Sequence, residues 1–385
     1  MEMHICWHLY PLGFTAAPVR PTPEERHLTH RLGHIERWLD YAAGMHANTL
    51  QLGPIFTSET HGYDTLDHFS IDPRLGTLND FDSLVAAAHT RGLGIVLDGV
   101  FNHVASAHPL AQAGHTSGAV FEGHKDLVEL DHESPQVIEY IAEVMNFWLD
   151  RGITGWRLDA AYAVAPETWA RVLPKVRERH PDAWFVGEMI HGDYNEYVAA
   201  SGLDSVTQYE LWKAIWSSLK DGNFYELDWC LQRNNDLNFA PMTFVGNHDV
   251  TRIATTLSDR QAMFALLILC TVSGEPSIYY GDEQVFRGEK EERHGGDDAV
   301  RPAFPEGPGL LAPDGQWMYE LHRKLLGFRA ERPWLAQAKT YPVHLANTQY
   351  TYEVHGPAGE RLKVSIDLDA DTAAIEEHGH QVLSI

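Results

Sequence analysis

An arginine and an aspartate lie two residues apart in the stretch GWRLDAA at residues 155–161. If this stretch is a strand, Arg157 and Asp159 share one face, because successive side chains of a strand point to opposite sides. The apolar Trp156 and Leu158 share the other face, where they can pack under a helix. A guanidinium beside a carboxylate keeps it ionised and oriented, as a covalent nucleophile requires. A structural ion pair at a strand end is the alternative interpretation.

Further acids and histidines follow other apolar stretches. Asp98 ends an apolar run and precedes Asn102 and His103. Glu188 directly follows another run, and residues 246–249 read Gly-Asn-His-Asp. Paired carboxylates at one rim suit glycoside hydrolysis, in which one attacks the sugar or activates water and the other donates a proton to the leaving oxygen. An isolated acid at a strand end is often only a cap, but several such ends together indicate an active site.

A metal-dependent hydrolase is the competing class for histidines and aspartates at strand ends. Such a site usually has two histidines at alternate positions of the first strand, whereas His4 and His8 are further apart and would not be juxtaposed. The three cysteines, Cys6, Cys230 and Cys270, show neither zinc-binding spacing nor a disulfide framework. The pattern therefore favours carboxylate chemistry.

The elements that must position these residues alternate between strand and helix. Runs that predict strands lie at residues 4–9, 49–52, 94–98, 155–159, 183–187, 204–206, 241–245 and 275–280. Helical patterns separate most of them, including one that Asn79 or Asp80 would cap. This alternation predicts an α/β fold, a (β/α)8 TIM barrel, whose strand ends carry the active site at one rim. A doubly wound sheet would need a glycine-rich turn after the first strand, and residues 11–14, Pro-Leu-Gly-Phe, are not one.

We predict three regions along the chain. Residues 1–103 and 131–335 form the catalytic barrel. Residues 104–130, rich in small residues, histidine and glycine, form a short excursion after the third strand. Residues 336–385 form a small antiparallel β domain, predicted by short alternating runs at 343–345, 350–354 and 362–366.

Composition excludes several kinds of partner. The formal net charge is −25, whereas nucleic acids and anionic membranes attract basic patches. No stretch has the length and apolarity of a membrane span. Residues 1–7 lack the basic and long apolar regions of a signal peptide. We therefore predict a cytoplasmic protein with a neutral or cationic ligand; the sequence does not predict its oligomeric state.

Four motifs resemble those of the α-amylase family of glycoside hydrolases. They are Asp98-Gly-Val-Phe-Asn-His103, Gly155-Trp-Arg-Leu-Asp-Ala160, Gly187-Glu188 and Val245-Gly-Asn-His-Asp249, in the order and rough spacing of the family. Gly62-Tyr63-Asp64-Thr65-Leu66-Asp67 is most similar to the neopullulanase, cyclomaltodextrinase and α-glucosidase group. The resemblance covers about residues 1–335. It implies a TIM barrel with a short domain B excursion and a C-terminal β domain.

The resemblance implies roles for the acids of these motifs. Asp159 matches the nucleophile, and Glu188 matches the general acid/base. Asp249 matches the third acid, which binds sugar hydroxyls and stabilises the oxocarbenium-like state. Arg157 matches the residue that orients the nucleophile, and Asp98 matches a supporting acid.

The resemblance also implies a set of substrate-binding residues. His103 and His248 match the histidines that hydrogen-bond the glucose in the cleaved subsite, and Tyr63 matches the aromatic residue that stacks under it. We expect Asp64 and Arg301 to form a pair that closes the non-reducing end of this subsite and favours short substrates. A surface salt bridge is the alternative for that pair.

The resemblance implies no resident cofactor. Asn102 matches a calcium ligand of true amylases, but domain B normally supplies the remaining ligands, and the excursion at 104–130 is short for that domain. Ala161-Tyr162 stands where many amylases have a Lys-His pair that contacts the sugar beyond the cleavage point. The acceptor is therefore not predicted.

The implied function is that of a retaining α-glycosidase. It would cleave, and could transfer, α-glucosidic bonds in short α-glucans through a covalent glycosyl-enzyme. A specialised α-glucosyltransferase or an isomerase acting on an α-glucoside stays open, because water and sugar acceptors compete for one glycosyl-enzyme. A non-catalytic sugar-binding or interaction subunit is the third possibility. Such relatives usually lose a catalytic acid, and all three acids are present here.

Overall fold

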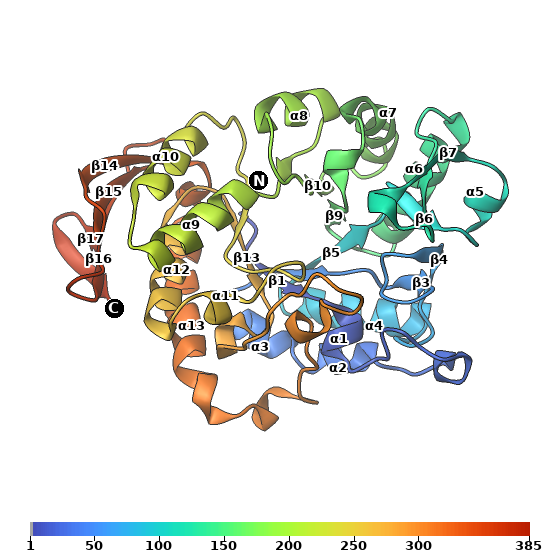
Figure 1. Ribbon diagram of the computed structural model, residues 1–385, viewed down its shortest axis with the longest axis horizontal. Helices are drawn as coiled ribbons and strands as arrows, with labels where there is room; N and C mark the ends of the chain where they lie inside the picture. Colours follow the sequence, from blue (N-terminus) through green and yellow to red (C-terminus); the bar gives the residue numbers. More distant parts are fainter. Residues whose placement is uncertain (1–2) are drawn as a thin grey trace.

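Eight parallel strands form the centre of the computed structural model, which describes residues 3–385 (Figure 1). In sheet order they are β11 (Ser205–Val206), β10 (Trp184–Gly187), β9 (Gly155–Leu158), β5 (Gly94–Gly99), β2 (Thr49–Leu52), β1 (Cys6–Leu9), β13 (Glu275–Tyr279) and β12 (Met242–Phe244). A parallel bridge between Thr207 and Met242 joins the two edges. The sheet therefore closes into a barrel, which confirms the predicted (β/α)8 class.

Helices cover the outside of this barrel (Figure 1). They are α1 (Pro11–Phe14), α2 (Leu32–Glu36), α3 (Leu39–Gly44), α4 (Leu78–Thr90), α6 (Pro135–Leu149), α7 (Pro166–Arg177), α8 (Tyr194–Ser201), α9 (Tyr209–Asp221), α10 (Tyr225–Asn234), α11 (Ile253–Thr256), α12 (Asp259–Thr271) and α13 (Gln316–Ala330). In α6, Ile138, Ile141, Met145 and Trp148 are buried on one side, as their helical spacing requires. Proline at the first position of α6 fixes where the helix begins.

The cap predicted for α4 is corrected by the structure. Thr77, not Asn79 or Asp80, is the N-cap: its side chain accepts a hydrogen bond from the Asp80 backbone N–H, and Asp80 reaches back to the Thr77 N–H. This reciprocal arrangement is a capping box. Asp80 is the second partner of this capping box and not the cap itself.

Two insertions rise from the rim at which the strands end. After β2, a hairpin is formed by β3 (Phe56–Ser58) and β4 (Thr65–Ile71). After β5, a three-stranded antiparallel sheet is formed by β6 (His103–Ala105), β8 (Leu127–Leu130) and β7 (Thr116–Val120). The short helix α5 (Pro109–Gln112) lies between β6 and β7 in the chain. This small sheet is the excursion expected after the third barrel strand.

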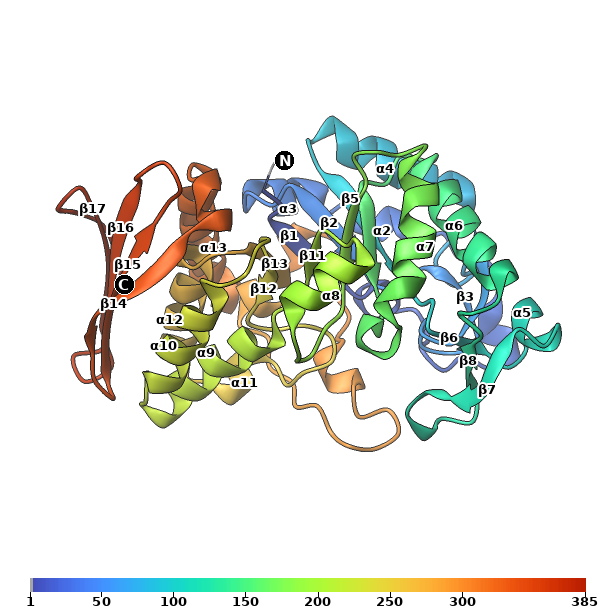
Figure 2. The ribbon, with the colours of Figure 1, turned by 90° about the horizontal axis from the view of Figure 1, so that it is seen from above.

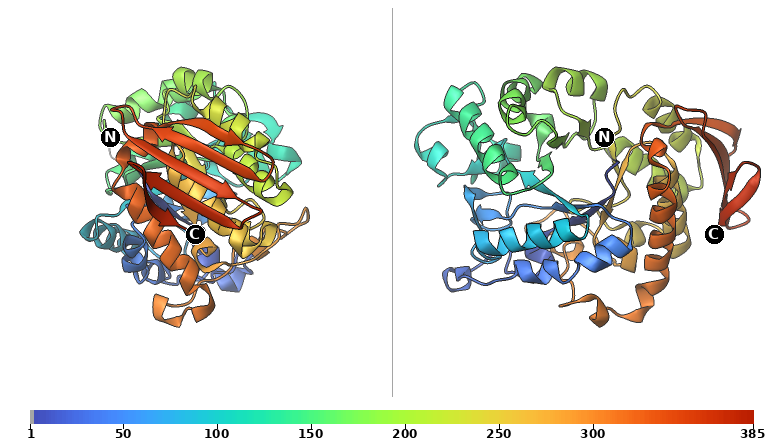
Figure 3. Two further views of the ribbon diagram at one scale, coloured as in Figure 1. Left: turned by 90° about the vertical axis from the view of Figure 1, so that its left-hand side faces the viewer. Right: turned by 180° about the vertical axis from the view of Figure 1, so that it is seen from behind.

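The C-terminal part is a five-stranded antiparallel sheet, as predicted (Figure 3). Its strands are β14 (Lys339–Leu345), β15 (Gln349–His355), β16 (Arg361–Asp367), β17 (Thr372–Glu377) and β18 (His380–Ser384). Its apolar face packs toward α10, α12 and α13, which separate it from the barrel (Figure 2). The Tyr352 hydroxyl hydrogen-bonds Thr271 of α12 at 2.8 Å, so α12 is buried between two layers.

Among residues 3–385, the structure contains no helix that is long and apolar enough to cross a membrane.

Candidate active site

Charged side chains gather where the barrel strands end. Asp98 lies near the end of β5 and Arg157 lies on β9, whereas Asp159 and Glu188 directly follow β9 and β10. Asp249 lies in the loop after β12. Because all eight strands are parallel, these positions share one rim of the barrel. The structure thus brings together the acids that the sequence motifs placed apart in the chain.

Arg157 is the hub of this cluster. Its Nη1 donates to both Asp98 oxygens at 2.8 and 2.9 Å and to Asp159 Oδ1 at 2.7 Å. Its Nη2 lies 2.6 Å from Glu188 Oε1. The arginine is only 2% exposed, so these charge-assisted contacts are shielded from water. One buried guanidinium therefore holds three carboxylates in place.

Asp159 and Glu188 are both buried beside Arg157. Burial raises the pKa of Asp159 to about 6, although Arg157 opposes the shift. Burial also raises the pKa of Glu188, again against Arg157, while the neighbouring charges of Asp159 and Asp249 add to the rise. Glu188 is therefore inclined to carry a proton at a pH where an ordinary glutamate would not.

Backbone and side-chain donors orient Glu188. The Ala160 backbone N–H donates to Oε2 at 2.9 Å, and Ala160 adopts a left-handed conformation with φ of 46°. A non-glycine residue in this conformation is strained, as is common at functional sites. The Tyr209 hydroxyl donates to Oε1 at 3.2 Å and accepts from Asn247 Nδ2 at 2.8 Å. Sequence reasoning missed Tyr209, because a tyrosine at the start of a helix carries no catalytic signature.

Asp249 sits between two cationic or polar partners. Its Oδ2 lies 3.0 Å from His248 Nε2, and its Oδ1 accepts from Arg301 Nη2 at 2.9 Å. Burial acts to raise its pKa, but His248 and Arg301 overcome this effect and hold the pKa well below the ordinary value. Asp249 is therefore held in its ionised form, whereas burial and neighbouring charges raise the pKa of Glu188.

Tyr63 and the two histidines line the same rim. The Tyr63 hydroxyl donates to Asp98 Oδ2 at 3.0 Å and contacts His248 Nε2, and its ring is parallel to that of His248. His103 is 1% exposed, and Phe121 of the excursion stacks on it with 4.2 Å between ring centroids. The structure thus places Tyr63 and His248 against Asp98 and Asp249, and His103 beneath Phe121 of the excursion.

The expected ion pair between Asp64 and Arg301 is not formed within residues 3–385. Arg301 instead contacts Asp249 at 2.9 Å and Asp297 at 3.2 Å. The Asp64 carboxylate accepts a hydrogen bond from the Thr60 hydroxyl. The Arg301 guanidinium is oriented toward Asp249 and Asp297, whereas the Asp64 carboxylate is oriented toward Thr60 and lies 4.0 Å from His61 Nε2. Both residues still belong to the site region, since Arg301 also lies over the Tyr63 ring.

Asn102, the candidate calcium ligand, contacts two neighbouring residues. Its amide Nδ2 lies 3.2 Å from His103 Nδ1, and its backbone carbonyl accepts from the Leu130 N–H. Across residues 3–385, no group of three or more His, Cys, Asp and Glu side chains is arranged to hold a metal. Calcium binding at Asn102 stays a prediction.

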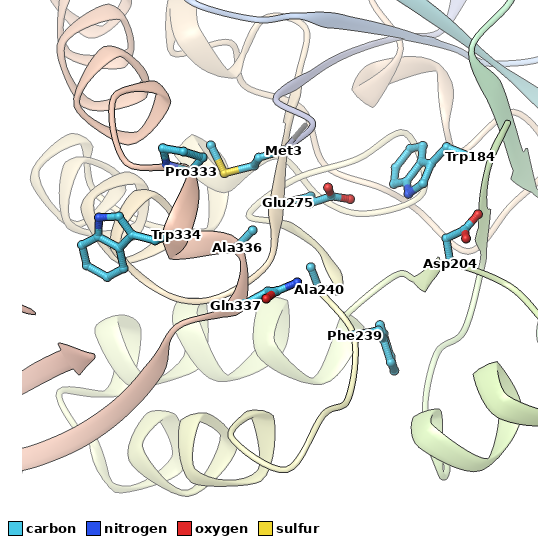
Figure 4. Close-up of a pocket in the computed structure, with 10 residues that line it drawn as sticks. All are labelled: Met3, Trp184, Asp204, Phe239, Ala240, Glu275, Pro333, Trp334, Ala336 and Gln337. Atoms are coloured by element: carbon cyan, nitrogen blue, oxygen red, sulfur yellow. The ribbon is translucent and has the colours of Figure 1, made fainter. Parts of the chain in front are cut away.

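A cavity lies at the opposite end of the barrel from the carboxylates, where the strands begin. It has a volume of about 340 Å³ and is lined at its centre by Trp184 and Glu275, the first residues of β10 and β13 (Figure 4). Active sites of TIM barrels lie where strands end, not where they begin. Size alone thus does not mark the functional site, and the carboxylate rim is the better candidate.

Comparison with known proteins agrees with this geometry. The family model described as the catalytic domain of alpha amylase matches residues 31–122 and 119–353. Alpha-amylase 3 of Dictyoglomus thermophilum is 28% identical over 300 residues, covering 66% of this chain and 60% of that protein. Neopullulanase 2 of Thermoactinomyces vulgaris is 31% identical over 286 residues, covering 65% of this chain and 48% of that protein. The chain thus spans less than two thirds of each relative.

Solved structures share the fold at lower sequence identity. The ligand-free cyclic alpha-maltosyl-(1→6)-maltose hydrolase from Arthrobacter globiformis has a TM-score of 0.81 at 24% identity, covering 99% of this chain and 98% of that one. An Anoxybacillus alpha-amylase has a TM-score of 0.82 at 20% identity, covering 99% and 95%. The matched catalytic-domain model covers most of the sequence, so the chain belongs to the α-amylase family of glycoside hydrolases.

Proposed function

We propose that this protein is a retaining α-glycosidase that cleaves, and can transfer, α-glucosidic bonds in short α-glucans. The observation that carries the proposal is the Arg157 guanidinium, which contacts Asp159 at 2.7 Å and Glu188 at 2.6 Å. Two carboxylates on the same guanidinium lie close together. Retaining glycosidases need such closeness, with the carboxyl groups about 5–5.5 Å apart, whereas inverting enzymes leave room for a water between them.

In the proposed first step, Asp159 attacks the anomeric carbon and forms a glycosyl-enzyme ester. Glu188 donates its proton to the leaving glycosidic oxygen, so the C–O bond breaks as the new bond forms. Asp249, held ionised by His248 and Arg301, stabilises the positive charge that develops on the sugar. In the second step Glu188 takes a proton from water, which attacks the same carbon and releases Asp159 with overall retention.

Unpartnered buried atoms support a sugar in this place. Asp64 Oδ1 and His103 Nε2 are buried and have no hydrogen-bond partner within residues 3–385. Leaving a buried polar atom unpaired costs about 1–3 kcal/mol, and sugar hydroxyls can both donate and accept hydrogen bonds. Bound glucose would thus satisfy these atoms, while the Tyr63 ring offers an apolar face to its carbon atoms.

The names of similar proteins support the substrate class. They include a neopullulanase, cyclomaltodextrinases, maltogenic amylases and a cyclic maltosyl-maltose hydrolase. We therefore place α-linked gluco-oligosaccharides first among candidate substrates of this chain. Linkage and chain length are left to experiment.

Product analysis tests the proposal. The wild-type protein and its Asp159→Ala variant would be incubated with maltotriose, maltotetraose, β-cyclodextrin, pullulan, isomaltose, sucrose and trehalose. We expect shorter maltooligosaccharides from the wild type only, and added longer products would identify transfer. Turnover of sucrose, trehalose or isomaltose alone would favour the specialised glucosyltransferase or isomerase. A folded wild type that turns over nothing in the panel would contradict the α-glucanase proposal.

A further inference from the structure

A small cavity lies inside the barrel, directly beneath the rim that carries the carboxylates. Its volume is about 20 Å³, and its lining includes His8 of β1, Gln51 of β2, His248 and Ser277 of β13. A cavity needs roughly 10–15 Å³ to hold one water molecule. The space is therefore large enough to hold one water molecule.

Two ring nitrogens that line this cavity lack partners. His8 Nε2 and His248 Nδ1 are buried without a hydrogen bond in the part of the chain that the structure describes. His8 is 3% exposed and His248 is 1% exposed, and their rings meet edge to face with centroids 5.0 Å apart. Buried polar atoms in proteins nearly always have a partner, which is often an ordered water.

The hydrogen-bond pattern of the rim fixes the tautomer of His248. The Tyr63 hydroxyl has one proton, which it donates to Asp98 Oδ2 at 3.0 Å. The Tyr63 oxygen contacts His248 Nε2, and this nitrogen also faces the ionised Asp249 carboxylate at 3.0 Å, which needs a donor. Nε2 thus carries the proton. Burial lowers the pKa of His248, which favours the neutral ring. In the neutral ring Nδ1 is an acceptor that needs a donor from below.

We propose that one buried water bridges His8 and His248 and that His8 is a positioning residue for the His248–Asp249 pair. His8 Nε2–H donates to the water, and the water donates to His248 Nδ1. Gln51 and Ser277 lie on the same cavity wall and can take its second hydrogen. The bridge extends the network His248–Tyr63–Asp98 to the floor of the site, so it fixes the rotation of the His248 ring.

This inference goes beyond the roles predicted from the sequence motifs, in which His8 had none. His8 touches no substrate atom in this arrangement and acts only through His248. Its effect on turnover rests on the proposed glycosidase function, whereas the water and the tautomer do not. The experiments are therefore chosen so that the two proposals can fail separately.

The first measurement is structural and needs no activity. An atomic-resolution crystal structure of the wild type should show one ordered water between His8 Nε2 and His248 Nδ1. In His8→Phe the added ring atoms fill the cavity and the water should be gone. Long-range nitrogen NMR of histidine-labelled protein should show His248 Nδ1 unprotonated in the wild type and its shift altered in His8→Phe. A dry cavity, or an Nδ1–H in the wild type, would overturn the proposal.

The second measurement uses turnover and a conservative rescue. Leaving His248 Nδ1 unpaired should lower kcat/KM of His8→Phe about 5- to 100-fold, the equivalent of one unsatisfied buried acceptor. His8→Gln offers an N–H near the same place and should recover most of the loss. His322→Phe is the matched control, because His322 is 2% exposed in α13 and touches no site residue. Equal kcat/KM in His8→Phe and wild type would refute the positioning role even if the water is found.

Discussion

At the scale of single residues, one buried cation organises the chemistry. Arg157 contacts Asp98, Asp159 and Glu188 within 2.9 Å. It lowers the proton affinity of each carboxyl, while burial raises it. The competition leaves Asp159 near a pKa of about 6 and raises that of Glu188. A nucleophile and a proton donor can thus coexist in one small space.

The proposed roles of Asp159 and Glu188 predict a bell-shaped pH dependence of kcat/KM, because the active form has Asp159 ionised and Glu188 protonated. Activity should fall as pH drops through about 6, because Asp159 becomes protonated and can no longer attack. Activity should also fall on the alkaline side, because Glu188 loses the proton that the leaving oxygen needs. The alkaline limb should lie above the ordinary carboxyl range, since the pKa of Glu188 is raised. Initial rates on maltotriose across pH measure both limbs.

A second substrate tests whether Glu188 sets the alkaline limb of the pH profile. With α-glucosyl fluoride, whose leaving group needs no proton, Glu188→Gln should keep the acid limb and lose the alkaline one. An alkaline limb that persists in Glu188→Gln would show that another group sets it.

Arg301 provides a second prediction for single residues. Its guanidinium is the partner that holds Asp249 Oδ1 at 2.9 Å. Arg301→Met should raise the pKa of Asp249 and lower kcat/KM by about 10- to 100-fold, the usual cost of one hydrogen bond to a charged group. Asp297→Asn is the control, because Asp297 contacts the same Arg301 Nη2 at the longer distance of 3.2 Å and its replacement leaves the Arg301–Asp249 contact in place, so it should cost little. Equal losses in both variants would mean that the ion pair with Asp249 is not what matters.

At the scale of elements, the close pairing of β9 with β10 fixes the positions of Asp159 and Glu188 along the barrel axis. Gly155 opens β9, and a Cβ there would lie 2.0 Å from the Trp184 carbonyl oxygen of β10. The two strands pair in register from Gly155 with Trp184 to Leu158 with Gly187. Asp159 and Glu188 follow directly, so this register places them side by side.

Gly155→Ala should therefore separate β9 from β10. We expect it to lower the free energy of unfolding by about 1–3 kcal/mol, as overpacking does, and to reduce activity through the misplaced Asp159. Gly33→Ala is the matched control, since a Cβ at Gly33 in α2 meets no atom within 4 Å. Replacing this glycine by alanine in a helix should raise the free energy of unfolding by roughly 1 kcal/mol. Urea unfolding measures both variants, and an unchanged midpoint for Gly155→Ala would contradict this account of the strand pair.

Strands with a strong hydrophobic pattern could be predicted from the sequence, whereas strands with a weak pattern could not. The apolar runs that become β5, β9, β10 and β13 are buried on both faces, so sequence alone identified them. Strands β17 and β18 contain the half-buried Glu376 and Glu377 and the exposed His380, and these polar residues hid the alternation of the strands. The hairpin β3–β4 is likewise absent from the strands predicted above, because its polar residues interrupt the hydrophobic pattern. Contacts across the chain, such as that of Tyr209 with Glu188, have no local signal at all.

At the scale of the whole molecule, the C-terminal sheet shares the core of the barrel. Tyr350, Tyr352 and Val364 of the sheet belong to one continuous cluster of buried apolar residues with Leu266 and Leu269 of α12. An ion pair between Arg332 and Glu377 at 2.7 Å adds a polar link. We propose that residues 336–385 are an integral part of the folding unit rather than an independent domain.

A shared core predicts one cooperative unfolding transition. Calorimetry of the full chain should show a single endotherm, and a chain ending at residue 338 should fold poorly or melt at a lower temperature, because removing the sheet uncovers apolar residues of α12. Two separate endotherms, or a truncated barrel with an unchanged melting temperature, would contradict the proposal that the sheet and barrel are one unit.

The central claim is that Asp159 forms a covalent bond to the sugar. Incubation of the wild type with 5-fluoro-α-glucosyl fluoride should trap this intermediate, because fluoride leaves readily while the ring fluorine slows hydrolysis of the ester. Peptide mass spectrometry should then place one glycosyl label on the peptide that contains Asp159, and Asp159→Ala should remain unlabelled. A label on another carboxylate, or turnover of the reagent without any labelled state, would contradict the account.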